Sequence, residues 1–219
     1  AEAAQNYNTS GLDYSYGPEK KENRLLTLYA NYNKLVESIK SSFDVTAGYD
    51  YQYWKSTTPL YSEMNTLGEI QKTSKAKDER HVLLSYYGRL NYSFDSRYML
   101  TTTIRRDATS RFAKNVRWGT FPSVALGWRV TEESFLKDNK VLSNLKLRAS
   151  YGVTGQQDGI GNYNYLPIYT QSQNGAEASM GNGYIHTYRP SSYVPDLKWE
   201  TTTSWNVGFD FGFLKDRIT

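Results

Sequence analysis

The sequence predicts an all-β fold, an antiparallel meander of about seven long strands that forms part of a transmembrane β-barrel. Three observations lead to this prediction. Apolar and polar residues alternate along several long segments, and short connections alternate with long ones. Aromatic residues make up 15% of a chain whose mean hydropathy is nevertheless polar. Barrel strands produce this combination because only every second residue faces lipid.

The alternation is clearest in segment 43–53, where Phe43 and Val45 lie on one face and Asp44 and Thr46 on the other. Segments 84–94 and 199–213 repeat the pattern. A strand over 199–213 would be about 50 Å long, well beyond the roughly 17 to 20 Å of an ordinary globular strand. Weaker alternation predicts four more strands, at 25–36, 98–106, 118–130 and 145–153.

The connections between these strands differ in length at the two strand ends. Segments 37–42, 95–97 and 214–217 are short turns, whereas 54–80, 107–117 and 154–198 are long and rich in Gly, Asn, Ser and Tyr. Outer-membrane barrels have short periplasmic turns and long outer loops. Segment 131–144 is an exception, because it should be periplasmic but is long, and we expect a helical turn at its start.

Composition excludes several classes of protein. No segment approaches the roughly 18 consecutive apolar residues of a membrane helix. The absence of cysteine removes disulfide frameworks and thiolate metal sites. The net charge of +4 arises from basic residues interleaved with acidic ones, as in 72–80, which indicates a solvated loop and no nucleic-acid partner.

A longer motif adds a family resemblance. Segment 105–123 reads RRDATSRFAKNVRWGTFPS and resembles a barrel signature of SusC/RagA-family TonB-dependent transporters, R-x-D-G-S-S-R-F-G-x-N-N-R-W-G-x-F-P-S. The match continues in order through 125–129, 145–156, 195–202 and 208–214, and 87–92 is the best match before it. Ala108 and Ala113 replace the glycines common in the family, and Val116 replaces an asparagine. If those glycines need positive φ, this loop turns differently.

The resemblance implies a barrel of about 22 strands with a plugged lumen. It also implies a TonB-energised importer of oligosaccharides or other large nutrients in the outer membrane of Bacteroidetes, which handles glycans or peptides with a SusD-like surface lipoprotein. Residues 1–219 are then expected to be a partial barrel domain that lacks the plug, the TonB box and the signal peptide. Because such a piece has open sheet edges, we expect it to be insoluble or self-associating when made alone.

Two loops hold the candidate site residues. Loop 154–198 combines aromatic rings with amides and hydroxyls, which suits contact with a glycan, contact with a partner protein, or packing within the loop. Its candidates are Tyr163, Tyr165, Tyr169, Tyr184, His186 and Tyr188. The signature loop contributes Arg106, Asp107, Arg111, Phe112, Arg117 and Trp118. Its charged group Arg106, Asp107 and Arg111 suits an anion, although stabilisation of a tight loop is the simpler interpretation.

The histidines and the glycine-rich segment 155–162 do not indicate catalysis or metal binding. His81 and His186 are not at metal-ligand spacing, and the glycines and Asp158 within 155–162 do not form a calcium loop. We therefore predict no catalytic residue, metal or cofactor, and no enzyme. The tryptophans are expected near strand ends, in interfacial girdles or facing lipid; they are Trp54, Trp118, Trp128, Trp199 and Trp205.

Two other classes of protein share parts of this pattern. A passive outer-membrane channel or a surface adhesin barrel would have the same strands and loops. A soluble secreted β-sandwich that binds glycans would bury its apolar faces between two sheets. The fifteen-residue alternation of 199–213 argues against the sandwich, whose strands are shorter.

Overall fold

The computed structural model describes residues 6–7, 12–16, 18–65, 67–136, 141–172, 177–181, 183–213 and 217. The chain divides into two compact units. One unit comprises residues 1–26 and 51–83, and the other comprises 27–50 and 84–219.

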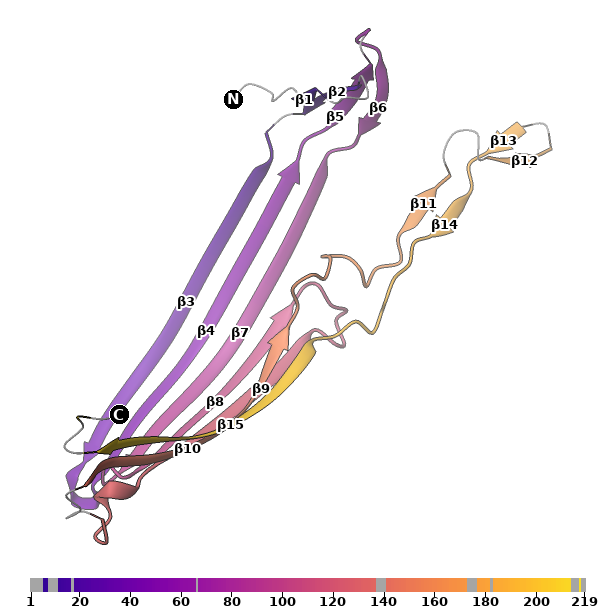
Figure 1. Ribbon diagram of the computed structural model, residues 1–219. Helices are drawn as coiled ribbons and strands as arrows, with labels where there is room; N and C mark the ends of the chain where they lie inside the picture. Colours follow the sequence, from indigo (N-terminus) through magenta and orange to yellow (C-terminus); the bar gives the residue numbers. More distant parts are fainter. Residues whose placement is uncertain are drawn as a thin grey trace. The chain divides into compact units, whose positions relative to one another are not determined.

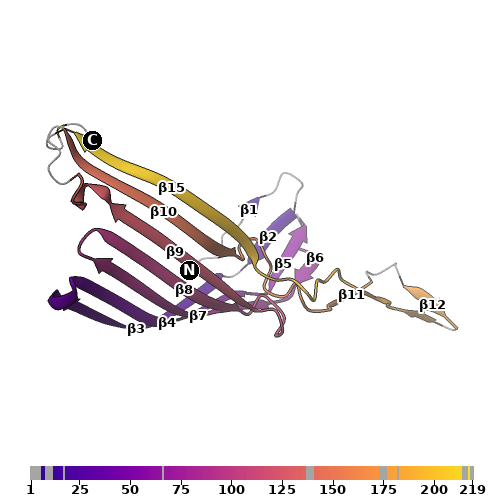
Figure 2. The same cartoon turned by 90° about the horizontal axis from the view of Figure 1, so that it is seen from below.

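Seven long antiparallel strands form one sheet in the order β15-β10-β9-β8-β7-β4-β3 (Figure 1). They are β3 (Lys20–Val36), β4 (Ser41–Thr58), β7 (Lys77–Phe94), β8 (Tyr98–Thr109), β9 (Trp118–Arg129), β10 (Leu142–Gln156) and β15 (Glu200–Phe213). From β3 to β10, each strand lies beside its neighbour in this series, and β15 joins the edge at β10 (Figure 2). The predicted meander is therefore confirmed.

The long connections are more ordered than the sequence predicted. Segment 54–80 is not one loop, because β4 continues to Thr58, β7 starts at Lys77, and two strands lie between them. Those two, β5 (Tyr61–Asn65) and β6 (Ile70–Ser74), form a sheet in the order β1-β2-β5-β6 with β1 (Asn6–Tyr7) and β2 (Leu12–Tyr16). The sequences of β5 and β6 do not alternate apolar and polar residues, so the pattern on which the prediction depended did not show these strands.

Segment 154–198 also contains strands. β10 runs on to Gln156, past its predicted end. Beyond it, β11 (Tyr169–Gln171) pairs with β14 (Tyr188–Pro190), and β12 (Ala178–Met180) pairs with β13 (Gly183–Ile185). The two pairs form a ribbon that extends past the end of β10 (Figure 1). We call residues 163–194 the tyrosine ribbon.

The short connections have the predicted form. The β3–β4 turn contains the 3₁₀ helix η1 (Glu37–Ile39), and Lys40 after it takes φ 48°. Asp95 and Ser96 close the β7–β8 turn with φ 47° and 55°. The helical turn expected at the start of 131–144 is η2 (Val130–Glu132), a 3₁₀ helix that begins one residue earlier. In the connection predicted at 214–217, residues 214–216 lie outside the described part. No helix among the described residues is long and apolar enough to cross a membrane.

The register places the apolar residues of β8, β9, β10 and β15 on one face, which we call the outward face. Cross-strand rows join Leu100, Leu126, Ala149 and Val207, and likewise Thr102, Val124, Tyr151 and Trp205. The Val207 and Trp205 side chains are 75% and 74% exposed. The alternate rows, such as Thr103, Ser123, Gly152 and Ser204, form a polar inward face. An exposed apolar face of this extent requires an apolar environment.

Candidate functional site

The signature loop is packed around three aromatic rings at the end of the strands where the long connections lie, the loop end. Phe112 is 0% exposed and meets the Trp199 ring edge-on, with centroids 5.6 Å apart. Phe121 meets the same indole at 5.3 Å. Ala108 and Thr109 at the end of β8 are buried beside the loop. These residues form the loop-end core, and they are most of the buried apolar residues in the described part of the chain.

Two glycines let the backbone approach the loop-end core closely. A Cβ atom at Gly155 would lie 2.1 Å from Cζ of Phe121, and one at Gly119 would lie 2.4 Å from the same atom. No real Cβ atom tolerates such distances, so both positions need glycine while Phe121 keeps its place between β9 and β10. Because Phe121 is fixed against Trp199, the core joins the ends of β9, β10 and β15.

Hydrogen bonds fix the signature loop to the first residues after β10. The carbonyl oxygen of Arg117 accepts from the Trp199 indole Nε1 at 2.9 Å and from the Thr109 amide at 3.3 Å. Arg111 donates to the Gln157 carbonyl at 3.1 Å and to Asn162 Oδ1 at 3.2 Å. The signature loop therefore holds the base of the tyrosine ribbon.

Arg106, Asp107 and Arg111 do not gather into one charged group. Asp107 accepts from Arg105 Nε at 2.9 and 3.1 Å, on the inward face. Arg106 lies on the opposite face, and the Arg111 guanidinium donates to Gln157 and Asn162. The reason is the two-residue period of a strand, which puts residues 105 and 107 on one face and 106 on the other.

Arg105 organises a polar cluster that sequence reasoning missed. Its guanidinium donates to Ser85 Oγ at 2.9 Å, lies 3.5 Å from Asp50, and stands 5.7 Å from the centroid of the Tyr87 ring. A Cβ at Gly48 would clash with the same Tyr87 ring. The even spacing of Arg105 and Asp107 along β8 was the sequence signal for this pairing.

Arg106 and Trp118 belong to the outward face. The guanidinium carbon of Arg106 lies 5.0 Å from the centroid of the Trp118 ring, within cation–π range. Trp118 in turn stacks on Tyr86 at 6.1 Å. Arg117, next in the chain, is partly buried, and its Nε has no hydrogen-bond partner among the described residues. Arg106 and Arg117 therefore have different surroundings.

The tyrosines of the ribbon fall into two groups. Tyr163 and Tyr165 are partly buried near its base, and Tyr169, Tyr184 and Tyr188 are exposed. Because Gln171 pairs with Tyr188 and Tyr169 with Pro190, Tyr169 and Tyr188 project from the same face of the β11–β14 pair. His186 is partly buried, with Nε2 3.2 Å from Glu177 Oε1 and Nδ1 3.5 Å from Ser172 Oγ. His186 thus joins the two arms of the ribbon.

The tryptophans do not share one role. Trp205 is exposed on the outward face, and Trp118 is partly exposed there, as expected for lipid-facing or girdle residues. Trp199 is buried in the loop-end core, so the lipid-facing prediction is wrong for it. Trp54 stacks on His81 at 4.7 Å. Trp128 donates from Nε1 to Glu133 Oε1 at 3.1 Å.

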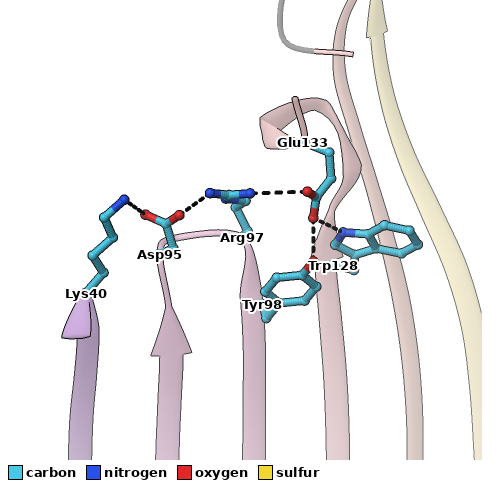
Figure 3. Close-up of polar contacts among 6 residues, drawn as sticks. All are labelled: Lys40, Asp95, Arg97, Tyr98, Trp128 and Glu133. Atoms are coloured by element: carbon cyan, nitrogen blue, oxygen red, sulfur yellow. Dashed lines mark hydrogen bonds and ion pairs between the residues drawn. The ribbon is translucent and has the colours of Figure 1, made fainter. Parts of the chain in front are cut away.

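A second polar network joins the connections at the opposite end of the strands, the turn end (Figure 3). Lys40 pairs with Asp95 at 3.4 Å, and Asp95 pairs with Arg97. Arg97 continues to Glu133 at 3.1 Å, and Glu133 also accepts from Tyr98 and Trp128. We call these six residues the turn-end network. It links the β3–β4, β7–β8 and β9–β10 connections.

Ionised carboxylates are favoured in this network. Hydrogen bonds from Tyr98 and Trp128, together with the charge of Arg97, hold the pKa of Glu133 below its ordinary value. The hydrogen bond and charge of Arg97 do the same for the pKa of Asp95. Both carboxylates are therefore charged at neutral pH.

No metal centre is found in the described part of the chain, where no three His, Cys, Asp or Glu side chains gather as ligands. Ala108 and Ala113 do not take positive φ, because the described non-glycine residues with positive φ are Lys40, Asp95 and Ser96. The signature loop turns through the Val116 amide, which donates to Ala113 O at 3.1 Å.

Comparison with known proteins fits this geometry. Residues 2–219 match the family described as TonB dependent receptor-like, beta-barrel, and the chain belongs to that family. It is a family of non-enzymatic outer-membrane β-barrels, which places the chain in the outer membrane and decides against the soluble β-sandwich.

Among curated relatives, the chain is 45% identical over 204 residues to the TonB-dependent receptor SusC of Bacteroides thetaiotaomicron, a match that covers 86% of this chain and 20% of SusC. It is 34% identical over 210 residues to the TonB-dependent receptor P39 of Formosa agariphila, covering 87% of this chain and 19% of that protein. The chain thus spans about a fifth of the length of these relatives.

Solved structures share the fold. The RagAB peptide importer in its "open-open" state superposes with a TM-score of 0.76 at 23% sequence identity, over 94% of this chain and 23% of that one. The RagAB peptide transporter gives 0.74 at 22% identity, over the same shares. The seven-stranded sheet therefore has the form of a section of a SusC/RagA-type barrel.

Proposed function

We propose that this chain forms wall and outer loops of a TonB-dependent importer that takes up oligosaccharides or other large nutrients together with a SusD-like surface lipoprotein. The observation that carries the proposal is the division of one sheet into an exposed apolar outward face and a polar inward face, with an aromatic ribbon anchored at the loop end. Similarity to SusC and to the RagAB importers supports it.

The tyrosine ribbon is the part of the chain best suited to contact a nutrient or the lipoprotein. Tyr184 is 75% exposed, and Tyr169 and Tyr188 share a face of the β11–β14 pair. Exposed tyrosine rings offer an apolar face for a sugar ring and a hydroxyl for hydrogen bonding. The same properties suit a protein partner.

The substrate class separates two versions of the proposal. SusC is the more similar relative in sequence, and the RagAB structures are those of peptide importers. Oligosaccharide is the version we favour, because the ribbon is rich in uncharged polar and aromatic groups. Peptide is the alternative that the structural neighbours favour.

The test is uptake by cells. A strain lacking the gene is complemented with the full-length wild-type protein, and the import of labelled oligosaccharides and labelled peptides is measured with and without a functional TonB system. We expect TonB-dependent import of oligosaccharide. TonB-independent passage of either probe would support the passive channel, and import of peptide alone would correct the substrate class.

A matched pair of variants tests the ribbon. Tyr184→Ala removes an exposed ring at the loop end, and Phe135→Ala removes one that is 70% exposed in the β9–β10 connection at the turn end. Import should fall several-fold in the first variant and stay at the wild-type rate in the second. Co-purification of the lipoprotein with each variant distinguishes a lost partner contact from a lost substrate contact.

A further inference from the structure

At the loop end, the last exposed side chain of β8 on the outward face is a cation, Arg106. Arg106 is exposed, it follows Ile104 on the same face of β8, and its guanidinium lies over the Trp118 ring. Ile104 is itself exposed. On β9, Pro122 pairs with Ile104, and Val124, two positions further along, is also exposed. An arginine at the edge of an apolar face is suited to an amphiphilic ligand, because the polar head can meet the guanidinium while the apolar tail lies along the apolar side chains.

Arg106 differs from Arg105 and Arg111 in having no acidic partner among the described residues. Arg105 pairs with Asp107 and Asp50, and Arg111 is within 3.9 Å of Asp158. Within the part of the chain that the structure describes, no carboxylate or other hydrogen-bond acceptor engages the Arg106 guanidinium. Stacking on an indole uses the plane of the guanidinium and leaves the N–H groups at its edge free for an anion.

The height of Arg106 along the strand matches a membrane interface. The Tyr98–Trp128 pair lies at the turn end and the Ala108–Trp118 pair at the loop end, ten residues further along β8. Ten residues span about 33 Å of strand, which at a tilt of 35–45° is about 25 Å of height, the thickness of the apolar band of outer-membrane barrels. Trp118 and Tyr86 therefore lie at the outer aromatic girdle.

From these observations we infer that Arg106, held by Trp118, binds the phosphate of an anionic lipid of the outer leaflet. The edge of the guanidinium donates to the phosphate oxygens, and acyl chains lie along Ile104 and Val124. The site rests on the outer-membrane location of the family and is independent of the nutrient that is imported.

The first test compares two lipids on the wild-type protein. Full-length protein is delipidated in mild detergent, mixed with lipid A that carries its phosphate or with the same lipid A after dephosphorylation, and analysed by native mass spectrometry. We expect the phosphorylated lipid to be retained about tenfold more, as charge-assisted hydrogen bonds to one phosphate predict. Equal retention of the two lipids would overturn the inference without recourse to any variant.

Variants then assign the effect to the site. Arg106→Gln should reduce retention of phosphorylated lipid A to the level of the dephosphorylated form. Arg89→Gln is the matched control, because Arg89 is also exposed but lies on the inward face, beside Asn91. Trp118→Leu should give an intermediate loss. Heat-modifiable migration in gels verifies that each variant has folded.

A competition experiment separates lipid from free phosphate. Inorganic phosphate at the concentration of lipid A should leave the lipid bound, because it lacks acyl chains to contact Ile104 and Val124. If inorganic phosphate displaces lipid A, or if Arg106→Gln retains as much lipid as the wild type, the site is not a lipid site.

Discussion

The loop end and the turn end of the same strands are stabilised by different interactions. At the loop end, Phe112, Phe121 and Trp199 pack edge to face, and glycines admit Phe121 between the strands. At the turn end, a chain of charges runs from Lys40 to Glu133 with little buried apolar surface. The loop end supports the tyrosine ribbon beyond the sheet, whereas the β3–β4 and β7–β8 connections at the turn end are short turns.

The two ends of the same strands are therefore stabilised by interactions that respond differently to conditions. Apolar burial at the loop end does not depend on the ionisation of side chains, which suits a base for loops exposed to the surroundings of the cell. Exposed ion pairs contribute less, and their contribution depends on ionisation. Variants at the two ends should therefore fail in different ways.

The largest effect is expected from Phe112→Ala. Loss of a fully buried phenyl ring costs about 3 to 5 kcal/mol, so the signature loop should detach from the base of the tyrosine ribbon. Limited proteolysis of the folded full-length protein should then cut within 107–117 or 154–162. Phe135→Ala, at an exposed ring, should leave the cleavage pattern of the wild type. Identical patterns in the two variants would contradict the loop-end core.

A pair of glycine variants sharpens the same point. In Gly155→Ala the new Cβ would lie 2.1 Å from Phe121 Cζ, so Phe121 must leave its place against Trp199, at a cost of about 1 to 3 kcal/mol. In Gly152→Ala on the same strand, the Cβ would meet Ser123 Cβ at an ordinary 3.4 Å. Hydrogen exchange of the β9–β10 pair should accelerate near Phe121 in the first variant alone. Equal exchange in both would show that Phe121 is not fixed.

The smallest effect is expected at the turn end, from Glu133→Gln. Because the folded-state pKa of Glu133 is lowered, its carboxylate stabilises the fold fully above the unfolded pKa of about 4.3, and this contribution is lost as pH falls through the folded value. The wild type should therefore exceed Glu133→Gln in thermal stability at pH 7, and the difference should shrink towards pH 3. A difference that is constant with pH would exclude this role of the carboxylate.

Much of the sheet could be predicted because alternation reports an apolar face. Residues 98–106 and 145–153 alternate where they face lipid, and the structure has strands there. The continuations to Thr109 and Gln156, and the strands β5 and β6, lack regular alternation of apolar and polar residues. In such segments the sequence pattern does not reveal a strand, although the backbone still pairs with its neighbours.

The site was harder to predict because its contacts are distant in sequence. Phe112 and Trp199 are 87 positions apart, and nothing local marks Trp199 as buried when four other tryptophans share the composition of a girdle residue. The pairing of Arg105 with Asp107 was available from the two-residue period of β8, and grouping Arg106 with Asp107 ignored that period. The turn-end network depends on Glu133 meeting Arg97 across 36 positions, which no short motif encodes.

The most direct test of the account asks which face of the sheet meets lipid. Single cysteines replace Val207 on the outward face and Asn206 on the inward face of β15 in the full-length protein, on a background free of other cysteines, and each is labelled with a fluorophore in brominated-lipid vesicles. The account predicts strong quenching of Val207→Cys and little quenching of Asn206→Cys. Equal quenching at the two adjacent positions, or the reverse order, would contradict a membrane-spanning barrel wall.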